Sequence, residues 1–174
     1  MTDEEKRIRS YLEAQGAKLA PAAIIEKVRA AMADLGAAAK GVPAARFTER
    51  PAAGEWSANE VLGHVVAAGA YFGGGITSAL DGTPPPPQMK GQGAVGAPVR
   101  SAGKWSELLA LDREALFARV LSADPLANLE RPIEHGMFGT LNWRETLLFM
   151  RLHDLDHAGQ LQKIAAALTA SRSV

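Results

Sequence analysis

The sequence contains no cysteine among its 174 residues. This absence excludes disulfides, thiolate metal ligands, cysteine nucleophiles and iron–sulfur clusters. It also agrees with a reducing compartment. The first ten residues, MTDEEKRIRS, are polar and acidic, whereas a secretory signal peptide begins with basic residues followed by an apolar run. We therefore expect a cytoplasmic protein.

The sequence also lacks an excess of charge of either sign and any long apolar run. Nineteen Lys and Arg balance nineteen Asp and Glu, so the formal net charge is zero. A neutral chain has no electrostatic footprint for nucleic acid. No stretch approaches the ~18 consecutive apolar residues of a membrane span. We expect neither a nucleic-acid partner nor a membrane, and the length predicts a single domain over residues 1–174.

Strand-forming residues are scarce, and apolar residues instead recur at helical spacing. The periodicity predicts four long helices and one short N-terminal helix; their ranges are 22–40, 57–80, 104–123, 143–168 and 3–16. Residues 81–103, rich in proline and glycine, predict a long crossover between the second and third long helices. Residues 126–141 predict a small hairpin or an ordered loop. The expected fold is all-α, a four-helix bundle with an extra short N-terminal helix. The run Gly73–Gly75 interrupts the 57–80 helix with weak helix formers, which leaves room for a kink or an early end there.

Three of the four histidines occupy positions where core residues are expected. In the last helix the inward stripe has spacings of three and four and contains Met150, His153, His157, Leu161, Ile164 and Leu168. His64 lies on the corresponding stripe of its own helix, between Val61 and Ala68. Two helices therefore present imidazoles to one bundle interior. His153 and His157 are one turn apart, a spacing at which two imidazoles can bind one divalent cation.

Alternatives to this metal site exist. A lone histidine on an apolar stripe is usually a core residue bonded to a carbonyl, but several buried imidazoles without partners would each cost roughly 1–3 kcal/mol. The segment 153–157 also has the spacing of the zinc-protease H-E-x-x-H motif, with Asp154 in place of the glutamate. No His, Asp or Glu follows His157 to supply a downstream ligand. The best third ligand is His64. Three histidines leave a coordination position open, which favours an enzyme over a closed structural site.

Four further residues are candidates for lining the cavity: Glu60, Tyr71, Thr146 and Gln160. Glu60 also fits a capping box that begins at Ser57, which is its preferred role. Tyr71 fits a core position with its hydroxyl at the rim. The carboxylates Asp154 and Asp156 flank the two histidines and are expected to be solvated or paired, for example Asp154 with Arg151. His135, in a glycine-flanked loop, is expected at the surface.

Three segments together resemble the DinB-like superfamily of helical-bundle metalloproteins. They are RPAAGEWSANEVLGH at 50–64, GTLNWRE at 139–145 and RLHDLDHAGQL at 151–161. The resemblance covers roughly residues 8 to 168 and implies a four-helix bundle with a long crossover. It implies His64, His153 and His157 as ligands of a divalent metal, often zinc or nickel. Many members of the family resemble homodimers.

The resemblance also suggests a reaction class. Some related proteins are transferases or isomerases that depend on a low-molecular-weight thiol such as glutathione, mycothiol or bacillithiol. We therefore expect a metal-dependent thiol S-transferase, or a related hydrolase or isomerase, acting on a small molecule. A non-catalytic metal-binding or stress-response interaction module is the alternative. The short, alanine-rich bundle would gain stability by burying a second surface, so a homodimer is expected.

Overall fold

The computed structural model describes residues 1–87 and 96–170 of the chain and is almost entirely helical, with one short hairpin. Its elements are α1 (Asp3–Lys18), α2 (Pro21–Gly41), a 3₁₀ turn (Ala44–Arg46), α3 (Ala58–Asp81), α4 (Ala102–Leu121), β1 (Ile133–His135), β2 (Gly139–Leu141) and α5 (Trp143–Ala170). The expected all-α fold is confirmed, and each predicted helix is present with its ends shifted by a few residues. No helix in the two described ranges is both long and apolar enough to cross a membrane.

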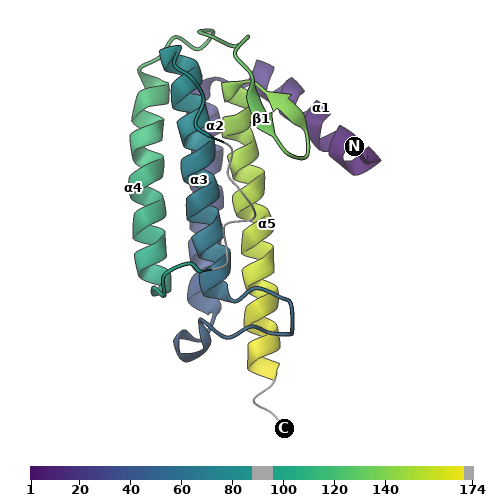
Figure 1. Cartoon of the computed structure of the whole chain (residues 1–174), viewed down its shortest axis with the longest axis vertical. Coiled ribbons are helices and arrows are strands. Elements are labelled where there is room, and N and C mark those ends of the chain that lie inside the picture. Colours follow the sequence, from purple (N-terminus) through teal and green to yellow (C-terminus); the bar gives the residue numbers. More distant parts are fainter. Residues whose placement is uncertain (88–95, 171–174) are drawn as a thin grey trace.

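The four long helices lie side by side, and α1 extends away from one end of the bundle (Figure 1). The helices α3 and α4 run in the same direction, so the end of α3 and the start of α4 lie at opposite ends of the bundle. Residues 88–95 of the predicted crossover, 81–103, lie outside the described residues. The helix α2 packs most extensively against α5, and α3 packs against both α4 and α5. This arrangement brings α3 and α5 together at the level of the histidines.

Local side-chain contacts determine where the site-bearing helices begin. At α3 the Ser57 hydroxyl accepts from the backbone N–H of Glu60, while the Glu60 carboxylate accepts from the backbone N–H of Ser57. The predicted capping box is therefore confirmed. At α5 the Asn142 side-chain oxygen accepts from the backbone N–H groups of Arg144 and Glu145. These caps satisfy N–H groups that have no partner within the helix.

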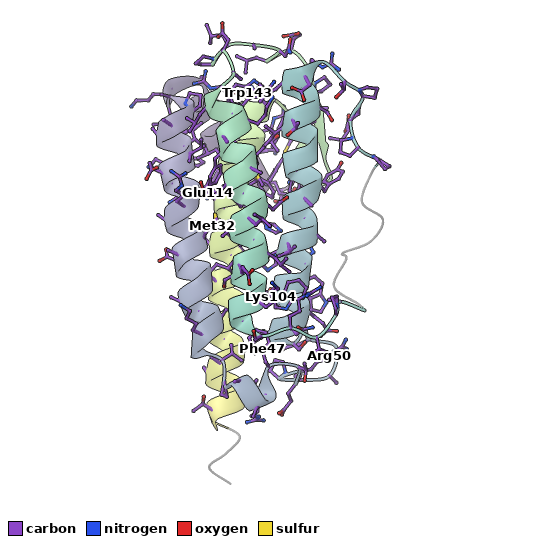
Figure 2. The ribbon with its side chains drawn as sticks, turned by 90° about the vertical axis from the view of Figure 1, so that its left-hand side faces the viewer. Met32, Phe47, Arg50, Lys104, Glu114 and Trp143 are labelled. Carbon is purple, nitrogen blue, oxygen red and sulfur yellow. The ribbon has the colours of Figure 1, made fainter. Side chains whose placement is uncertain are left out.

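The interior of the bundle contains two apolar clusters at different heights. The upper cluster includes Trp143 and the lower cluster includes Phe47, and the two lie at opposite ends in Figure 2. On α5 the upper cluster contains residues up to Met150, and the lower cluster begins at Ala158. The buried polar residues Asp154 and His157 lie between them. We call the interior side chains at this height the polar layer; its members are His64, Arg113, His153, Asp154 and His157.

The run Gly73–Gly75 does not end the helix early, because α3 continues unbroken to Asp81, close to the expected end at residue 80. A contact from another element accounts for one of the three glycines. A Cβ at Gly75 would lie 3.0 Å from Cγ2 of Ile133 in β1, which is tighter than ordinary packing. The hairpin of β1 and β2, paired with Ile133 opposite Leu141, packs against α3 there. The segment 126–141 is therefore anchored to the bundle rather than projecting from it.

Candidate metal centre

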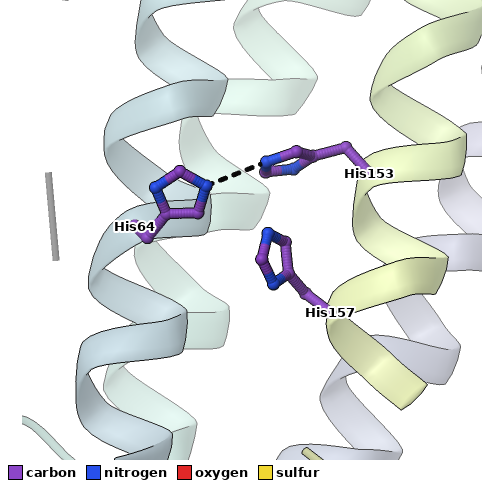
Figure 3. A group of neighbouring side chains, drawn as sticks. All are labelled: His64, His153 and His157. Carbon is purple, nitrogen blue, oxygen red and sulfur yellow. Dashed lines mark hydrogen bonds between the residues drawn. The ribbon is translucent and has the colours of Figure 1, made fainter. Parts of the chain in front are cut away.

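The three predicted histidines meet in the polar layer between α3 and α5. His64 extends from α3, and His153 and His157 extend from α5, with all three rings turned toward one another (Figure 3). Nε2 of His64 lies 3.1 Å from Nε2 of His153. One ring nitrogen of each residue can be chosen so that all three lie within 4.8 Å of one another. The periodicity of the two helices had predicted this convergence.

The rings are partly shielded from solvent. His157 is buried, and His64 and His153 are half-buried. The centroid of the His64 ring lies 5.1 Å from that of His153 and 5.0 Å from that of His157. The centroid of the Trp56 indole lies 5.1 Å from the centroid of the His64 ring. A site with restricted water strengthens any electrostatic interaction made inside it.

A hydrogen bond fixes the ring orientation of His157. Its Nδ1 lies 2.8 Å from Oε1 of Gln160, one turn further along α5. An amide oxygen only accepts, so Nδ1 carries the hydrogen and the lone pair is on Nε2. Partners of this kind orient histidine ligands in metal sites. Among the candidate cavity residues, Gln160 therefore acts directly on the histidine group.

The electrostatic environment keeps His157 neutral. Burial, and to a smaller extent the neighbouring His153 and His64, lowers the pKa of His157 to about 4. Neutral imidazole is the form that coordinates a metal ion. Three neutral imidazole nitrogens, with no thiolate available, suit a borderline divalent cation such as zinc or nickel. The residues present therefore fit a divalent metal ion.

An open pocket adjoins His157 on the side where Gln160 lies. A pocket of about 590 Å³ lies between α5 and the loop before α3, and its wall includes Trp56, His157, Gln160, Lys163 and Ile164. The pocket has the size of a small-molecule site. A molecule that enters it contacts the edge of the histidine group rather than a sealed interior.

The other candidate cavity residues have structural roles. Glu60 caps α3 and also forms an ion pair with Arg50. The hydroxyl of Thr146 donates to the backbone oxygen of Asn142. The hydroxyl of Tyr71 lies 3.5 Å from the backbone oxygen of Glu134, toward the hairpin. These contacts direct all three polar groups to partners other than the histidines.

Comparisons with known proteins establish the family and the fold of the chain. The family model for the DinB superfamily matches residues 25–161. The chain belongs to the DinB superfamily. A search of curated proteins gives no match. Among solved structures, a histidine-to-alanine variant of a mycothiol-dependent maleylpyruvate isomerase is similar, with a TM-score of 0.68 and 14% identity. The match covers 84% of this chain but 62% of the isomerase chain, so the shared part is the DinB-like fold.

One expectation about this DinB-superfamily chain is wrong: His135 is not a surface residue. It is 8% exposed and stacks between the rings of Phe72 and Phe138, with centroid distances of 5.4 and 4.7 Å. The flanking glycines suggested an exposed loop, but β1 alternates buried and exposed residues, and Ile133 and His135 share its buried face. That period-two pattern was the available signal. Burial lowers the pKa of His135 to about 4.

A second correction concerns Asp154, which is buried and does not pair with Arg151. It pairs with Arg113 of α4, and both side chains are 0% exposed. Burial lowers the pKa of Arg113, while the charges of Asp154 and Asp112 oppose this effect. Arg113 lies four residues after Leu109 and three before Leu116, so it is on the apolar stripe of α4. An arginine on such a stripe was the available signal of a buried partner.

We expect the free energy of unfolding of the metal-free protein to fall as pH drops below about 6.5. An unfolded histidine titrates near 6.5, whereas burial holds the pKa of His135 and His157 at about 4. Between these values the unfolded chain binds protons that the folded chain does not. The contribution of these histidines to the free energy of unfolding is therefore complete above about pH 6.5 and is lost as the pH falls toward about 4. Urea unfolding from about pH 7 to about pH 5 measures this, with a smaller loss expected for His135→Phe. A flat profile for the unsubstituted protein would contradict it.

Proposed function

We propose that the protein is a metal-dependent enzyme that binds one divalent cation, zinc or nickel, through His64, His153 and His157. Its reaction would be S-transfer with a low-molecular-weight thiol, or a related isomerisation or hydrolysis. The observation that carries the proposal is the convergence of three imidazole nitrogens within 4.8 Å beside an open pocket. Membership of the DinB superfamily, and a fold shared with a mycothiol-dependent isomerase, support it.

The three-histidine set would leave part of the coordination sphere free. A divalent cation held there would lower the pKa of a thiol that reached it and would stabilise the thiolate at neutral pH. The protein's own contribution is positioning. Gln160 holds His157 with its lone pair inward, and Trp56 forms part of the pocket wall beside that ring. Lys163 places a cation in the same wall, where an anionic group of a small substrate could be held.

We expect His153→Ala to lose nearly all bound metal, because the remaining histidines then come from different helices and no chelating pair is left on α5. Elemental analysis after chelator treatment, reloading and desalting measures the metal per chain. The matched control is His135→Phe, which removes a nearby buried histidine that is outside the ligand group and retains an aromatic ring for stacking. Equal metal content in the unsubstituted protein and His153→Ala would refute the three-histidine assignment.

The second candidate is a metal-binding or stress-response interaction module without turnover. The observation that favours it is the composition of the described donor group, which contains three histidines and no carboxylate. A catalytic centre generally also uses an acid or a base that does not hold the metal. The two candidates differ in whether a thiol can reach the centre.

Cobalt substitution distinguishes these candidates. We expect the cobalt-loaded protein to develop a sulfur-to-metal charge-transfer band when glutathione, mycothiol or bacillithiol is added, because three histidine ligands would leave a coordination position free for the thiol. The alcohol analogue of the same compound is the control and should give no such band. A spectrum unchanged by every thiol would favour the non-catalytic module.

We also propose that the chain folds as one domain and forms a homodimer. The alanine-rich helices offer few large side chains for a core, so a second buried surface would add stability. Light scattering at micromolar concentration should give twice the chain mass. A monomer mass under those conditions would show the dimer proposal to be wrong.

A further inference from the structure

A fully buried ion pair lies in the polar layer beside the histidines. Nη2 of Arg113, on α4, donates to both carboxylate oxygens of Asp154, on α5, at 3.1 and 3.4 Å. Both side chains are 0% exposed. Neither residue belongs to the histidine ligand group, so the proposed metal centre gives the pair no role of its own.

Burying the pair costs free energy of folding, which argues against a purely stabilising role. Two charges taken out of water lose their hydration, and apolar residues of similar volume often replace a buried pair without loss of stability. Nε and Nη1 of Arg113 are also buried and have no hydrogen-bond partner within the described residues. The guanidinium packs closely against α3: a Cβ at Gly69 would lie 3.4 Å from Nη2.

The position of Asp154 relative to His153 indicates another role. Oδ1 of Asp154 lies 3.9 Å from Nδ1 of His153. The other nitrogen of that ring, Nε2, is the one that lies 3.1 Å from His64. A carboxylate next to Nδ1 favours the tautomer with the hydrogen on that nitrogen. The lone pair of His153 is then on Nε2, toward the other two histidines.

Comparison of the two histidines on α5 supports this assignment. Gln160 keeps the hydrogen of His157 on Nδ1 through a direct hydrogen bond. Asp154 would act on His153 through its charge, and the hydrogen bonds from Arg113 would fix that carboxylate in place. Each α5 histidine therefore has its own polar partner on the side away from the centre.

We propose that the buried Arg113–Asp154 pair is a positioning element that holds the Nδ1–H tautomer of His153 and so keeps Nε2 free to bind a cation. In the metal-free protein, His64 is then the donor in the contact between the two Nε2 atoms. The inference rests on the proposed function for its purpose, but the tautomer it requires can be measured without any metal.

The test compares ring nitrogen chemical shifts of His153 in metal-free protein, recorded by ¹⁵N NMR and assigned with His153→Ala. The main variant is Arg113→Met with Asp154→Leu, which removes both charges together because a single substitution would leave the other charge buried and unpaired. The matched control is Arg119→Met with Asp81→Leu, which removes a partly exposed pair that also involves α4. A second variant, Arg113→Gln with Asp154→Asn, keeps uncharged polar side chains at both positions in case the apolar variant does not fold.

We expect Nδ1–H in the unsubstituted protein and in the control. Both Arg113–Asp154 double variants should shift the ring hydrogen of His153 partly or fully to Nε2, because no full negative charge remains beside Nδ1. We call these two the interior variants. Cobalt affinity should fall about 10- to 100-fold in the interior variants and stay unchanged in the control. If the Arg113–Asp154 pair had only a structural role, the interior variants would leave the tautomer of His153 unchanged.

The outcomes separate this inference from the proposed function. If the interior variants fold, keep Nδ1–H and bind cobalt as tightly as the unsubstituted protein, the positioning role is overturned and the metal centre stands. If the unsubstituted protein binds no cobalt but the tautomer changes as expected, the metal centre fails and the effect of the pair on His153 is upheld.

Discussion

The bundle depends on reconciling a layer of polar side chains with an otherwise apolar interior. Between the upper and lower clusters, α3, α4 and α5 contribute imidazoles, a carboxylate and a guanidinium to the interior. Polar groups in such a place cost free energy unless each finds a partner. Asp154 forms an ion pair with Arg113, and His157 forms a hydrogen bond with Gln160. The inward nitrogens of the three histidines face one another, and a divalent cation would satisfy all of them together.

The same constraint explains why the site lies where α3 meets α5. The two helices must approach closely enough for their histidines to converge, and the glycines of α3 allow neighbouring elements to pack tightly against it. Gly69 accommodates the guanidinium of Arg113, and Gly75 accommodates Ile133 of the hairpin. The apolar clusters above and below pack the helices against one another, and this packing sets where the three histidines lie. Preorganisation of this kind is what a metal centre needs from its scaffold.

Local sequence patterns predicted the helices and the convergence of the three histidines because both depend on short-range periodicity. His64, His153 and His157 lie on apolar stripes, and a stripe specifies which side chains face the interior. The same patterns failed where the partner is distant in sequence. Asp154 and Arg113 are on different helices, and the hairpin residue that packs against Gly75, Ile133, follows much later in the sequence. His135 was assigned to the surface from its flanking glycines, although its burial depends on how β1 docks against the bundle. Tertiary contacts determine the partners and the burial of these residues. The period of a helix or strand indicates only which face a residue shares with its neighbours.

The most direct test of the account is X-ray absorption spectroscopy on the zinc-loaded protein. The account predicts a first shell with three imidazole nitrogens at ~2.0–2.1 Å and one or two light atoms from solvent. It also predicts that adding a thiol replaces a light atom with sulfur at ~2.3 Å. A first shell dominated by oxygen, or one with fewer than three imidazoles, would contradict the assignment of His64, His153 and His157 as the metal centre.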